Sequence, residues 1–371
     1  MQRTLGIGVI GLGHAGSRHA RALARGDVPG ARLEFVCDPK PERRAGFGVP
    51  ATPDPAEMLV RPSVDAVIVA TPHPAHLAMA GLALRAGRHV LVEKPLGVLA
   101  ADCDALLAEH AGLGPRAPLF GVVHDYRAEP RFRWLGAMLR RGELGRIERV
   151  VWQATDFFRT EAYYAESDWR GTFAGEGGGL LVNQAPHVLD LLVHWFGVPR
   201  RVLGICRFGR YHAIEVEDDV TAHLEFAAGF SALVVLGTGE APGTSRLEIS
   251  GDRGRVVLEG PELVFHKNRE PASVYRRRQA SGRPAVDSDR LAFPPSGPTG
   301  VAIVQNFVAA VRGEARLLAP AEQARAAVEL ANAITWSSLL ERPLELPIDV
   351  EGFRRVHGEL VRNGSRRAGS G

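Results

Sequence analysis

The sequence predicts an α/β protein of two domains, the first built on a parallel sheet and the second on an antiparallel sheet. Up to about Asp125, short apolar runs alternate with helical patterns, which is typical of parallel strands joined by crossover helices. Beyond that point, longer strand-like runs follow one another directly. We therefore expect a first domain at residues 1–124, a second at 125–362 and, at 363–371, a disordered tail too polar to pack.

In the first domain each expected strand is a short apolar run, and a helical pattern follows most of them. The strands are expected at Leu5–Ile10, Leu33–Cys37, Ala66–Ala70, His89–Val92 and Leu119–Val123. The helices are expected at about His14–Arg25, Ala75–Ala86 and Ala100–Ala111. Their alternation predicts one parallel sheet.

The second domain begins with an expected helix at Pro130–Arg141 and continues mainly as strands separated by hairpin signals. These strands are expected at Ile147–Phe157, Arg201–Phe208, Asp219–Phe226, Ser231–Gly237, Arg246–Ser250, Arg255–Glu259 and Leu263–His266. The polar, Pro/Gly-rich stretch from Arg269 to Gly300 is expected to be an excursion loop. Two helices, about Val301–Val311 and Pro320–Leu340, are expected to close the fold.

Composition excludes several classes of function. The residues are 45% hydrophobic and 23% charged, as in ordinary soluble globular proteins. A chain of 371 residues is long enough to form two domains, each with its own hydrophobic core. The formal net charge of +3 gives no clustered basic face for nucleic acid, and the Arg276–Arg278 run is interpreted as a solvated loop. The apolar run Leu5–Ile10 is too short to span a membrane and reads as a buried strand.

Cysteine usage points to a reducing compartment. Cys37, Cys103 and Cys206 are few, odd in number and far apart, so they form neither a disulfide framework nor a zinc-binding spacing. In the absence of a recognisable export signal, we expect a cytoplasmic protein.

A glycine-rich motif directly follows the first expected strand. Gly11 permits a tight turn, Gly13 lets backbone amides approach a pyrophosphate, and Gly16 lets the following helix pack on its strand. His14 and Ala15 lie at the N-terminus of that helix, where free N–H groups and the positive end of the dipole favour phosphates. The motif therefore predicts dinucleotide binding, the alternative being a plain strand–helix turn.

The end of the second strand bears on the choice of dinucleotide. Asp38 stands where a carboxylate accepts the ribose hydroxyls and repels a 2′-phosphate, which favours NAD. Lys40, Arg43 and Arg44 follow closely and can offset this repulsion, so NADP stays possible.

Two further strands end in polar residues that face the expected ligand crevice. Thr71 and Pro72 end the third strand, and His76 is expected to cap or pack near the cofactor. The nearby His73 reads as an exposed loop residue, because no carboxylate or cysteine accompanies the two histidines to make a metal site. No metal is expected.

Glu93 and Lys94 end the fourth strand. An ammonium group at this position can hydrogen-bond a substrate hydroxyl and stabilise a developing alkoxide. The alternative is an exposed lysine paired with Glu93.

A second glycine run, Gly177–Gly179, opens a helix expected to end near Phe196. His187 and Asp190 are three residues apart and share a face of that helix, and Asn183 faces the same way if the turn before it is helical. The histidine can accept a hydroxyl proton near neutral pH. The alternative is a core histidine tied to Asp190.

Taken together, the Gly11–Gly16 motif, Glu93-Lys94-Pro95, and the glycine run leading to His187 and Asp190 resemble the glucose–fructose oxidoreductase / inositol dehydrogenase / MocA family. The resemblance extends from Leu5 to about Ile348. It implies a Rossmann domain, then an α/β domain with a large open antiparallel sheet. It also implies an NAD(P)-dependent oxidoreductase acting on sugars, cyclitols or related polyols.

By position, Lys94 resembles the catalytic lysine of the family and His187 its catalytic histidine. Asn183 stands where many members carry an aspartate, so the sequence departs from the family there. An amide can still orient a substrate hydroxyl or the imidazole by hydrogen bonding. The departure affects the details of proton transfer more than the class of reaction.

The resemblance also makes four residues candidates for substrate contact, namely Tyr126, Arg127, Trp169 and Arg170. Trp169 offers a ring face to a sugar and Arg170 a fork of donors, although both could be structural.

We thus expect a dehydrogenase or reductase acting on CH–OH groups with NAD, or NADP, and a sugar or polyol as partner. The alternative is a cofactor-binding sensor that keeps the fold without turnover, and a lesser one is a reductase of a conjugated or cyclic substrate. A homo-oligomer is expected, because Val202–Ile205 and Leu233–Leu236 are too apolar for a solvated sheet face. The resemblance to the family implies that sheet faces pair to form a homodimer or homotetramer.

Overall fold

The computed structural model describes residues 3–293 and 300–364 and divides the chain into two compact units. Unit 1 comprises residues 1–128, 175–177 and 297–329, and unit 2 comprises 129–174, 178–296 and 330–371. Each unit has its own sheet, and each is described separately.

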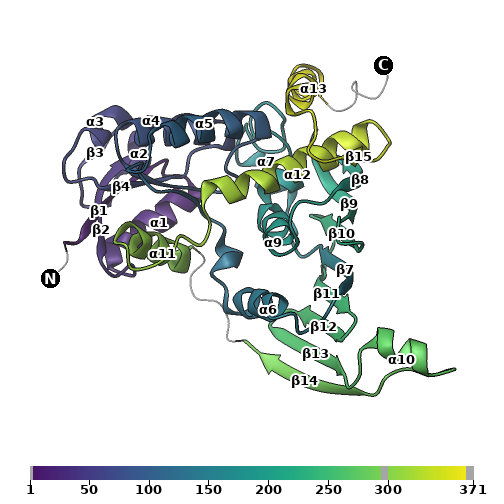
Figure 1. The fold of residues 1–371 in the computed structure, drawn as a ribbon. Helices are drawn as coiled ribbons and strands as arrows, with labels where there is room; N and C mark the ends of the chain where they lie inside the picture. Colours follow the sequence, from purple (N-terminus) through teal and green to yellow (C-terminus); the bar gives the residue numbers. More distant parts are fainter. Residues whose placement is uncertain (1–2, 294–299, 365–371) are drawn as a thin grey trace. The chain divides into compact units, whose positions relative to one another are not determined.

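Unit 1 contains a parallel sheet with the strand order β3-β2-β1-β4-β5-β6, six strands in the described part of the chain (Figure 1). These strands are β1 (Leu5–Ile10), β2 (Ala31–Cys37), β3 (Ala51–Thr52), β4 (Ala66–Val69), β5 (His89–Val92) and β6 (Phe120–Val122). The predicted parallel sheet is confirmed. Because all strands run the same way, their carboxyl ends share one edge.

The helices of unit 1 connect or flank these strands. They are α1 (His14–Arg25), α2 (Pro41–Arg44), α3 (Pro55–Leu59), α4 (His76–Arg85), α5 (Ala100–Gly112) and α11 (Val301–Val311), with the short 3₁₀ turns η1 (His73–Ala75) and η2 (Asp125–Arg127). A further helix, α12 (Ala321–Leu339), gives its first residues to unit 1 and the rest to unit 2.

The expected division at residue 124 differs from the structure, since unit 1 is assembled from three segments. Ile303, Val304, Phe307 and Val308 of α11 are buried in the same core cluster as Val9 of β1. A chain segment that follows unit 2 in sequence therefore completes the core of unit 1. The sequence placed α11 in the second domain because apolar periodicity predicts a buried face but not the partner that covers it.

Unit 2 contains a nine-stranded sheet in its described residues, with the order β14-β13-β12-β11-β7-β10-β9-β8-β15. Its strands are β7 (Ile147–Ala154), β8 (Arg201–Phe208), β9 (Glu217–Glu225), β10 (Ser231–Gly237), β11 (Ser245–Gly251), β12 (Gly254–Glu259), β13 (Glu262–Asn268), β14 (Val286–Ala292) and β15 (Leu344–Glu345). The sheet is mixed rather than purely antiparallel, because β7 and β10 pair in parallel. The chain leaves β7 through helices and returns to it only after β8 and β9, which makes that pair parallel.

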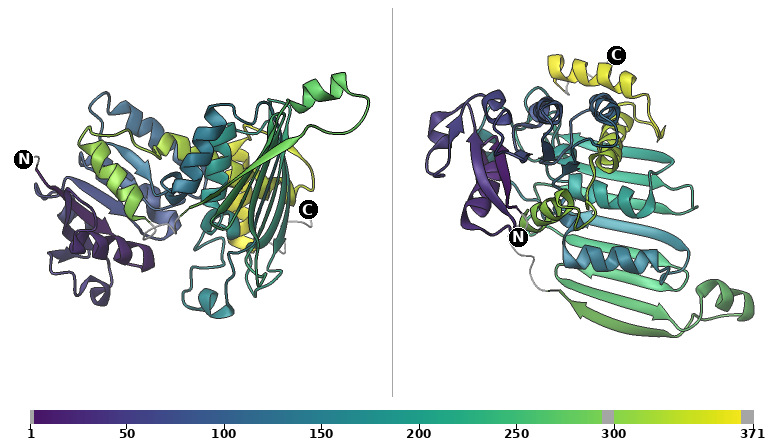
Figure 2. Two further views of the ribbon diagram at one scale, coloured as in Figure 1. Left: turned by 90° about the horizontal axis from the view of Figure 1, so that it is seen from below. Right: turned by 60° about the vertical axis from the view of Figure 1, so that its left-hand side comes forward.

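The other helices of unit 2 are α6 (Pro130–Arg140), α7 (Glu161–Ala165), α8 (Leu180–Asn183), α9 (Pro186–Phe196), α10 (Ala272–Arg278) and α13 (Val350–Asn363). Helices α6 and α9 and the second part of α12 lie on one face of the sheet (Figure 2). On that face Trp152 of β7 stacks on Trp195 and contacts Phe132, and the backbone N–H of Gly204 in β8 donates to Ser337 of α12.

One expectation for unit 2 is wrong, and a second can be compared with the structure only at its first residues. The stretch from Arg269 to Gly300 contains α10 and the edge strand β14, which pairs with β13 along its whole length. Arg276–Arg278 therefore end a helix, although they are exposed as expected. The expected tail at 363–371 overlaps the end of α13 at Asn363, and residues 365–371 lie outside the described residues. In the described ranges, no helix is long and apolar enough to cross a membrane.

Candidate active site

The glycine motif forms the turn from β1 into α1. Gly11 has a φ of 87° and donates its N–H to the Cys37 carbonyl, 2.8 Å away. A Cβ on Gly16 would lie 1.8 Å from the Gly11 oxygen, so this position admits only glycine. A Cβ on Gly13 would meet nothing within 4 Å. Two glycines are thus required by the turn itself, and the third leaves the backbone open to a ligand.

This difference leads to a test with paired substitutions. We expect Gly16→Ala to destabilise the protein by about 1–3 kcal/mol, the usual cost of overpacking, and to lower its thermal midpoint by several degrees. Gly13→Ala should leave the midpoint unchanged and weaken NAD binding by about tenfold or more, because the new methyl group hinders the approach of a phosphate. Thermal denaturation and calorimetric titration measure the two effects. Equal destabilisation by both substitutions would contradict this assignment.

Asp38 lies beside the glycine turn, as expected, but its carboxylate is only 2% exposed. One oxygen accepts from the Leu12 N–H at 2.8 Å and the other from the Lys40 N–H at 2.9 Å, while Arg43 lies 3.8 Å away. The carboxylate therefore stabilises the turn and faces a cation. Because its charge is already engaged in this way, the Asp38 carboxylate would repel the 2′-phosphate of NADP less strongly than we expected from the sequence.

A cavity of about 530 Å³ opens next to Gly13, and its charged lining is entirely basic. Its lining residues are Leu12, Gly13, His14, Ser17, Arg18, Arg21, Arg25 and Arg43. The N-terminus of α1 and the four guanidinium groups suit the phosphates of a dinucleotide. Sequence reasoning missed the three arginines of α1, although they recur every three or four residues and so share a helix face.

His76 forms hydrogen bonds with two loops at the carboxyl edge of the sheet, the one after β4 and the one after β5. It is fully buried, and its ring nitrogens lie 2.7 Å from the Pro95 oxygen and 2.8 Å from the Thr71 oxygen. Burial lowers the pKa of His76, and its two backbone hydrogen bonds oppose that shift. His76 thus positions the Thr71–Pro72 loop. His73 is buried against the Glu176 oxygen rather than exposed as expected. In the described residues, no group of three side chains could hold a metal ion.

Glu93 Oε1 forms a buried hydrogen bond with His19 Nε2 of α1 at 2.7 Å, next to Lys94. Burial by itself would raise the pKa of Glu93. The hydrogen bond and charge of His19 and the charges of Lys94 and Arg18 outweigh burial and lower that pKa to about 2. Lys94 is half-buried and directly follows β5. The structure thus places Lys94 beside a fixed negative charge on the same sheet edge as the glycine turn.

Asp125 is a residue of this edge that sequence reasoning missed. It follows β6, the neighbour of β5, and its Oδ1 is buried without a hydrogen-bond partner in the described part of the chain. Burial and the charge of Glu93 raise the pKa of Asp125 to about 7, while Arg18, His19 and Lys94 oppose the shift. Only the strand order, which the sequence does not reveal, makes Asp125 a neighbour of Lys94.

The pKa of Asp125 implies a pH-dependent stability. A carboxyl group whose pKa is raised on folding, here from 3.8 to about 7, costs stability as pH rises through that range. We expect Asp125→Asn to be more stable than the parent above about pH 7, by on the order of 1–3 kcal/mol, with the difference vanishing below about pH 4. Thermal denaturation across this range measures it, with Asp289→Asn, at an exposed aspartate, as the matched control. A difference independent of pH would exclude ionisation of Asp125 as its cause.

Tyr126 and Arg127 lie in η2 of unit 1, and only Tyr126 is half-exposed. Arg127 is buried and donates to the Leu318 oxygen at 2.8 Å and to Gln323 Oε1 at 2.5 Å. These bonds give Arg127 a structural role, and its expected contact with substrate is not supported.

In unit 2 the helix expected to end near Phe196 is α9, which begins at Pro186, and the short helix α8 precedes it, separated from it by Gln184 and Ala185. Asn183 ends α8 and donates its Nδ2 to the Tyr163 hydroxyl at 3.1 Å. His187 is half-buried in the first turn of α9, and Asp190 is fully buried. The Arg170 guanidinium lies 4.2 Å from the Tyr163 ring centroid and 5.4 Å from that of Trp169. Unit 2 thus brings Asn183 and Arg170 to Tyr163, which sequence reasoning missed, and places Trp169 beside Arg170.

Comparisons with known proteins match both units. Residues 5–116 match the oxidoreductase family with an NAD-binding Rossmann fold, and residues 132–257 match the GFO/IDH/MocA C-terminal domain. Inositol 2-dehydrogenase of Streptomyces avermitilis is 38% identical over 151 residues, which cover 39% of this chain and 43% of that protein. D-apiose dehydrogenase of Paraburkholderia graminis is 32% identical over 238 residues, covering 61% and 58%. The chain spans about half the length of the curated relatives it matches.

Among solved structures, the WlbA dehydrogenase from Chromobacterium violaceum, in complex with NADH and UDP-GlcNAcA, has a TM-score of 0.80 at 24% identity. That match covers 94% of this chain and 98% of the other. Levoglucosan dehydrogenase, in complex with NADH and levoglucosan, has a TM-score of 0.75 at 20% identity, covering 93% and 100%. At these identities the similarity establishes the fold alone.

Proposed function

Since the chain belongs to the GFO/IDH/MocA oxidoreductase family, we propose that it transfers a hydride between NAD, or NADP, and a hydroxyl or keto carbon of a sugar, cyclitol or sugar derivative. One observation carries this proposal. Lys94 follows β5 on the sheet edge that also bears the glycine turn, whose neighbouring cavity is lined by four arginines. A phosphate-binding cavity and an ammonium group on one edge are what a dinucleotide-dependent dehydrogenase requires.

The residues of unit 1 fit a bound dinucleotide. The open backbone at Gly13 and the N-terminus of α1 suit the pyrophosphate, and the basic cavity suits its charge. Thr71, Pro72 and Glu93 end neighbouring strands and would line the same ligand. When bound, the nicotinamide ring supplies the hydride acceptor or donor.

The proposed roles of the protein residues are distinct. Lys94 donates a hydrogen bond to the substrate hydroxyl and stabilises the negative charge that develops on its oxygen. His187 accepts the hydroxyl proton, and Asn183 orients the substrate by hydrogen bonding. The charge of Lys94 lowers the pKa of Glu93, so the two side chains interact electrostatically at this edge, which supports a charged lysine in this role.

The choice of substrate class is supported by the relatives, whose names include inositol 2-dehydrogenase and D-apiose dehydrogenase. To test the function, the purified protein is mixed with NAD or NADP and a panel of sugars and cyclitols, and absorbance of the reduced nicotinamide is followed. Reduction with one member of the panel supports the proposal. Tight binding of both cofactor and polyol without any reduction would instead favour a non-catalytic sensor.

We also propose that the chain forms a homodimer or homotetramer through the sheet face opposite to α9. Leu203, Ile205 and Leu233 on this face are 36%, 48% and 38% exposed. Leu203 and Ile205 alternate with buried residues of β8, so they share one side of the sheet. Ile205→Lys is expected to lower the mass measured by light scattering at micromolar concentration. A parent protein that is monomeric there would refute the proposal.

A further inference from the structure

Tyr163 of α7 lies between two guanidinium groups. The Arg159 Cζ is 5.0 Å from the ring centroid, and the Arg170 Cζ is 4.2 Å away. The Tyr163 hydroxyl accepts a hydrogen bond from Asn183 at 3.1 Å. Arg159, Tyr163, Ser167, Arg170 and Asn183, which we call the Tyr163 cluster, thus concentrate positive charge next to an amide assigned to substrate binding. All five belong to unit 2.

The positive charge of the cluster is poorly neutralised. Arg170 pairs with Glu166 at 3.0 Å, but that carboxylate is 68% exposed, where ion pairs contribute little. Arg159 donates to the backbone oxygens of Phe157 and Phe158, and no acidic side chain of the described residues pairs with it. Close to one full positive charge is therefore available to a ligand.

Several donors of the cluster are also buried without being used. The Nε atoms of Arg159 and Arg170 and the Ser167 hydroxyl have no hydrogen-bond partner within residues 3–293 and 300–364. A buried donor without an acceptor costs on the order of 1–3 kcal/mol, more when it is charged. These buried donors therefore cost free energy, and the negative charge of an anion bound next to the cluster would offset part of that cost.

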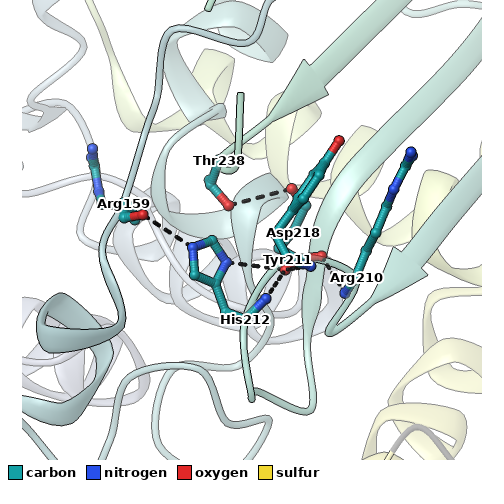
Figure 3. Close-up of polar contacts among 6 residues, drawn as sticks. All are labelled: Arg159, Arg210, Tyr211, His212, Asp218 and Thr238. Atoms are coloured by element: carbon teal, nitrogen blue, oxygen red, sulfur yellow. Dashed lines mark hydrogen bonds and ion pairs between the residues drawn. The ribbon is translucent and has the colours of Figure 1, made fainter. Parts of the chain in front are cut away.

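The backbone of Arg159 is held by a buried polar network, which Figure 3 shows. His212 Nε2 lies 3.1 Å from the Arg159 oxygen, and its Nδ1 lies 3.1 Å from Asp218. Asp218 also accepts the backbone N–H groups of Arg210, Tyr211 and His212. The Arg159 side chain points away from this network (Figure 3). The network therefore fixes the Arg159 backbone, from which the side chain extends. Fixing the backbone in advance reduces the conformational entropy that is lost when Arg159 binds a ligand.

On the basis of the proposed function, we propose that the substrate carries an anionic group, a carboxylate or a phosphate, which Arg159 and Arg170 bind beside Asn183. Planar guanidinium groups match the paired oxygens of both anions, and charge-assisted hydrogen bonds are about twice as strong as neutral ones. The substrate class narrows accordingly, from sugars in general to acidic or phosphorylated sugars and cyclitols.

The test measures binding without turnover. NADH-loaded protein is titrated by calorimetry with matched probes, namely glucose, glucuronate and glucose 6-phosphate, and inositol with an inositol monophosphate. At least one anionic probe should bind about tenfold or more tightly than its neutral partner, and whether the carboxylate or the phosphate does so identifies the anion. Equal affinity within every matched set would overturn the proposal.

Substitutions assign the effect to the cluster. Arg159→Gln and Arg170→Gln should each weaken binding of the preferred anion by about 10–100-fold and leave the neutral probe nearly unaffected. Arg170→Lys keeps the positive charge but lacks the paired N–H donors of a guanidinium group, so we expect an intermediate loss of affinity for the anion. This variant also controls for misfolding of Arg170→Gln. Arg200→Gln, at an arginine whose side chain is 66% exposed, is the matched control. An equal loss in this control would contradict the assignment.

The outcomes separate this inference from the proposed function. Arginine-dependent binding of an anionic probe, with no member of the panel oxidised, would support the anion site and refute hydride transfer. Efficient oxidation of a neutral polyol, with no anionic analogue bound, would refute the anion site and support hydride transfer.

Discussion

His187→Ala is expected to lower turnover of the best sugar or cyclitol by about 10²–10⁴-fold, the usual contribution of a positioned general acid–base. The affinity for NAD should stay almost unchanged, because His187 belongs to unit 2 whereas the glycine turn and the basic cavity belong to unit 1. Calorimetry gives the affinity, and steady-state kinetics over a full pH range gives the turnover. Near-normal turnover at every pH would show that His187 is not the proton acceptor.

A control and a companion variant sharpen this experiment. His194→Ala changes an exposed histidine further along α9 and should leave turnover unaffected. Asn183→Asp introduces a carboxylate four residues before His187 and should move the pH–rate profile upward, since a negative neighbour favours the protonated imidazole. An unmoved profile would place Asn183 away from the proton path.

Lys94→Ala is expected to lower turnover by about 10²–10³-fold, the usual cost of removing a donor to a developing oxyanion. NAD binding should survive at least in part, because the phosphates are assigned to the glycine turn and the cavity. Lys267→Ala, at an exposed lysine of β13, is the matched control. A change confined to KM, with turnover intact, would mean that Lys94 only binds substrate and does not stabilise charge in the transition state.

Features of the fold that depend on local signals could be predicted from the sequence. The strands of unit 1 are buried apolar runs, and the turn at Gly11 and Gly16 follows from steric limits that act within a few residues. The edge strand β14 has a mostly exposed, polar pattern, so its pairing with β13 left no apolar signature. The packing of α11 into the core of unit 1 could not be predicted either, because apolar periodicity shows that a helix has a buried face but not which element packs against it.

The same distinction applies to the candidate site. Lys94 and His187 lie at positions that short motifs mark, and the resemblance to the family assigned their roles. Asp125 and Arg159 carry no motif. The first depends on the order of β5 and β6, and the second on a backbone held by His212, which lies 53 residues away in sequence. Such residues emerge only once the topology is known.

The completion of the unit 1 core by α11 has a consequence for biosynthesis. While the ribosome is still translating unit 2, the sheet of unit 1 lacks Phe307 and Val308, which are buried in its core. The N-terminal part therefore cannot reach its final packing as an independent domain and keeps apolar surface uncovered until residues 301–311 have emerged. Because exposed apolar surface makes such intermediates prone to aggregate, we expect chaperones to bind this surface until residues 301–311 have been synthesised.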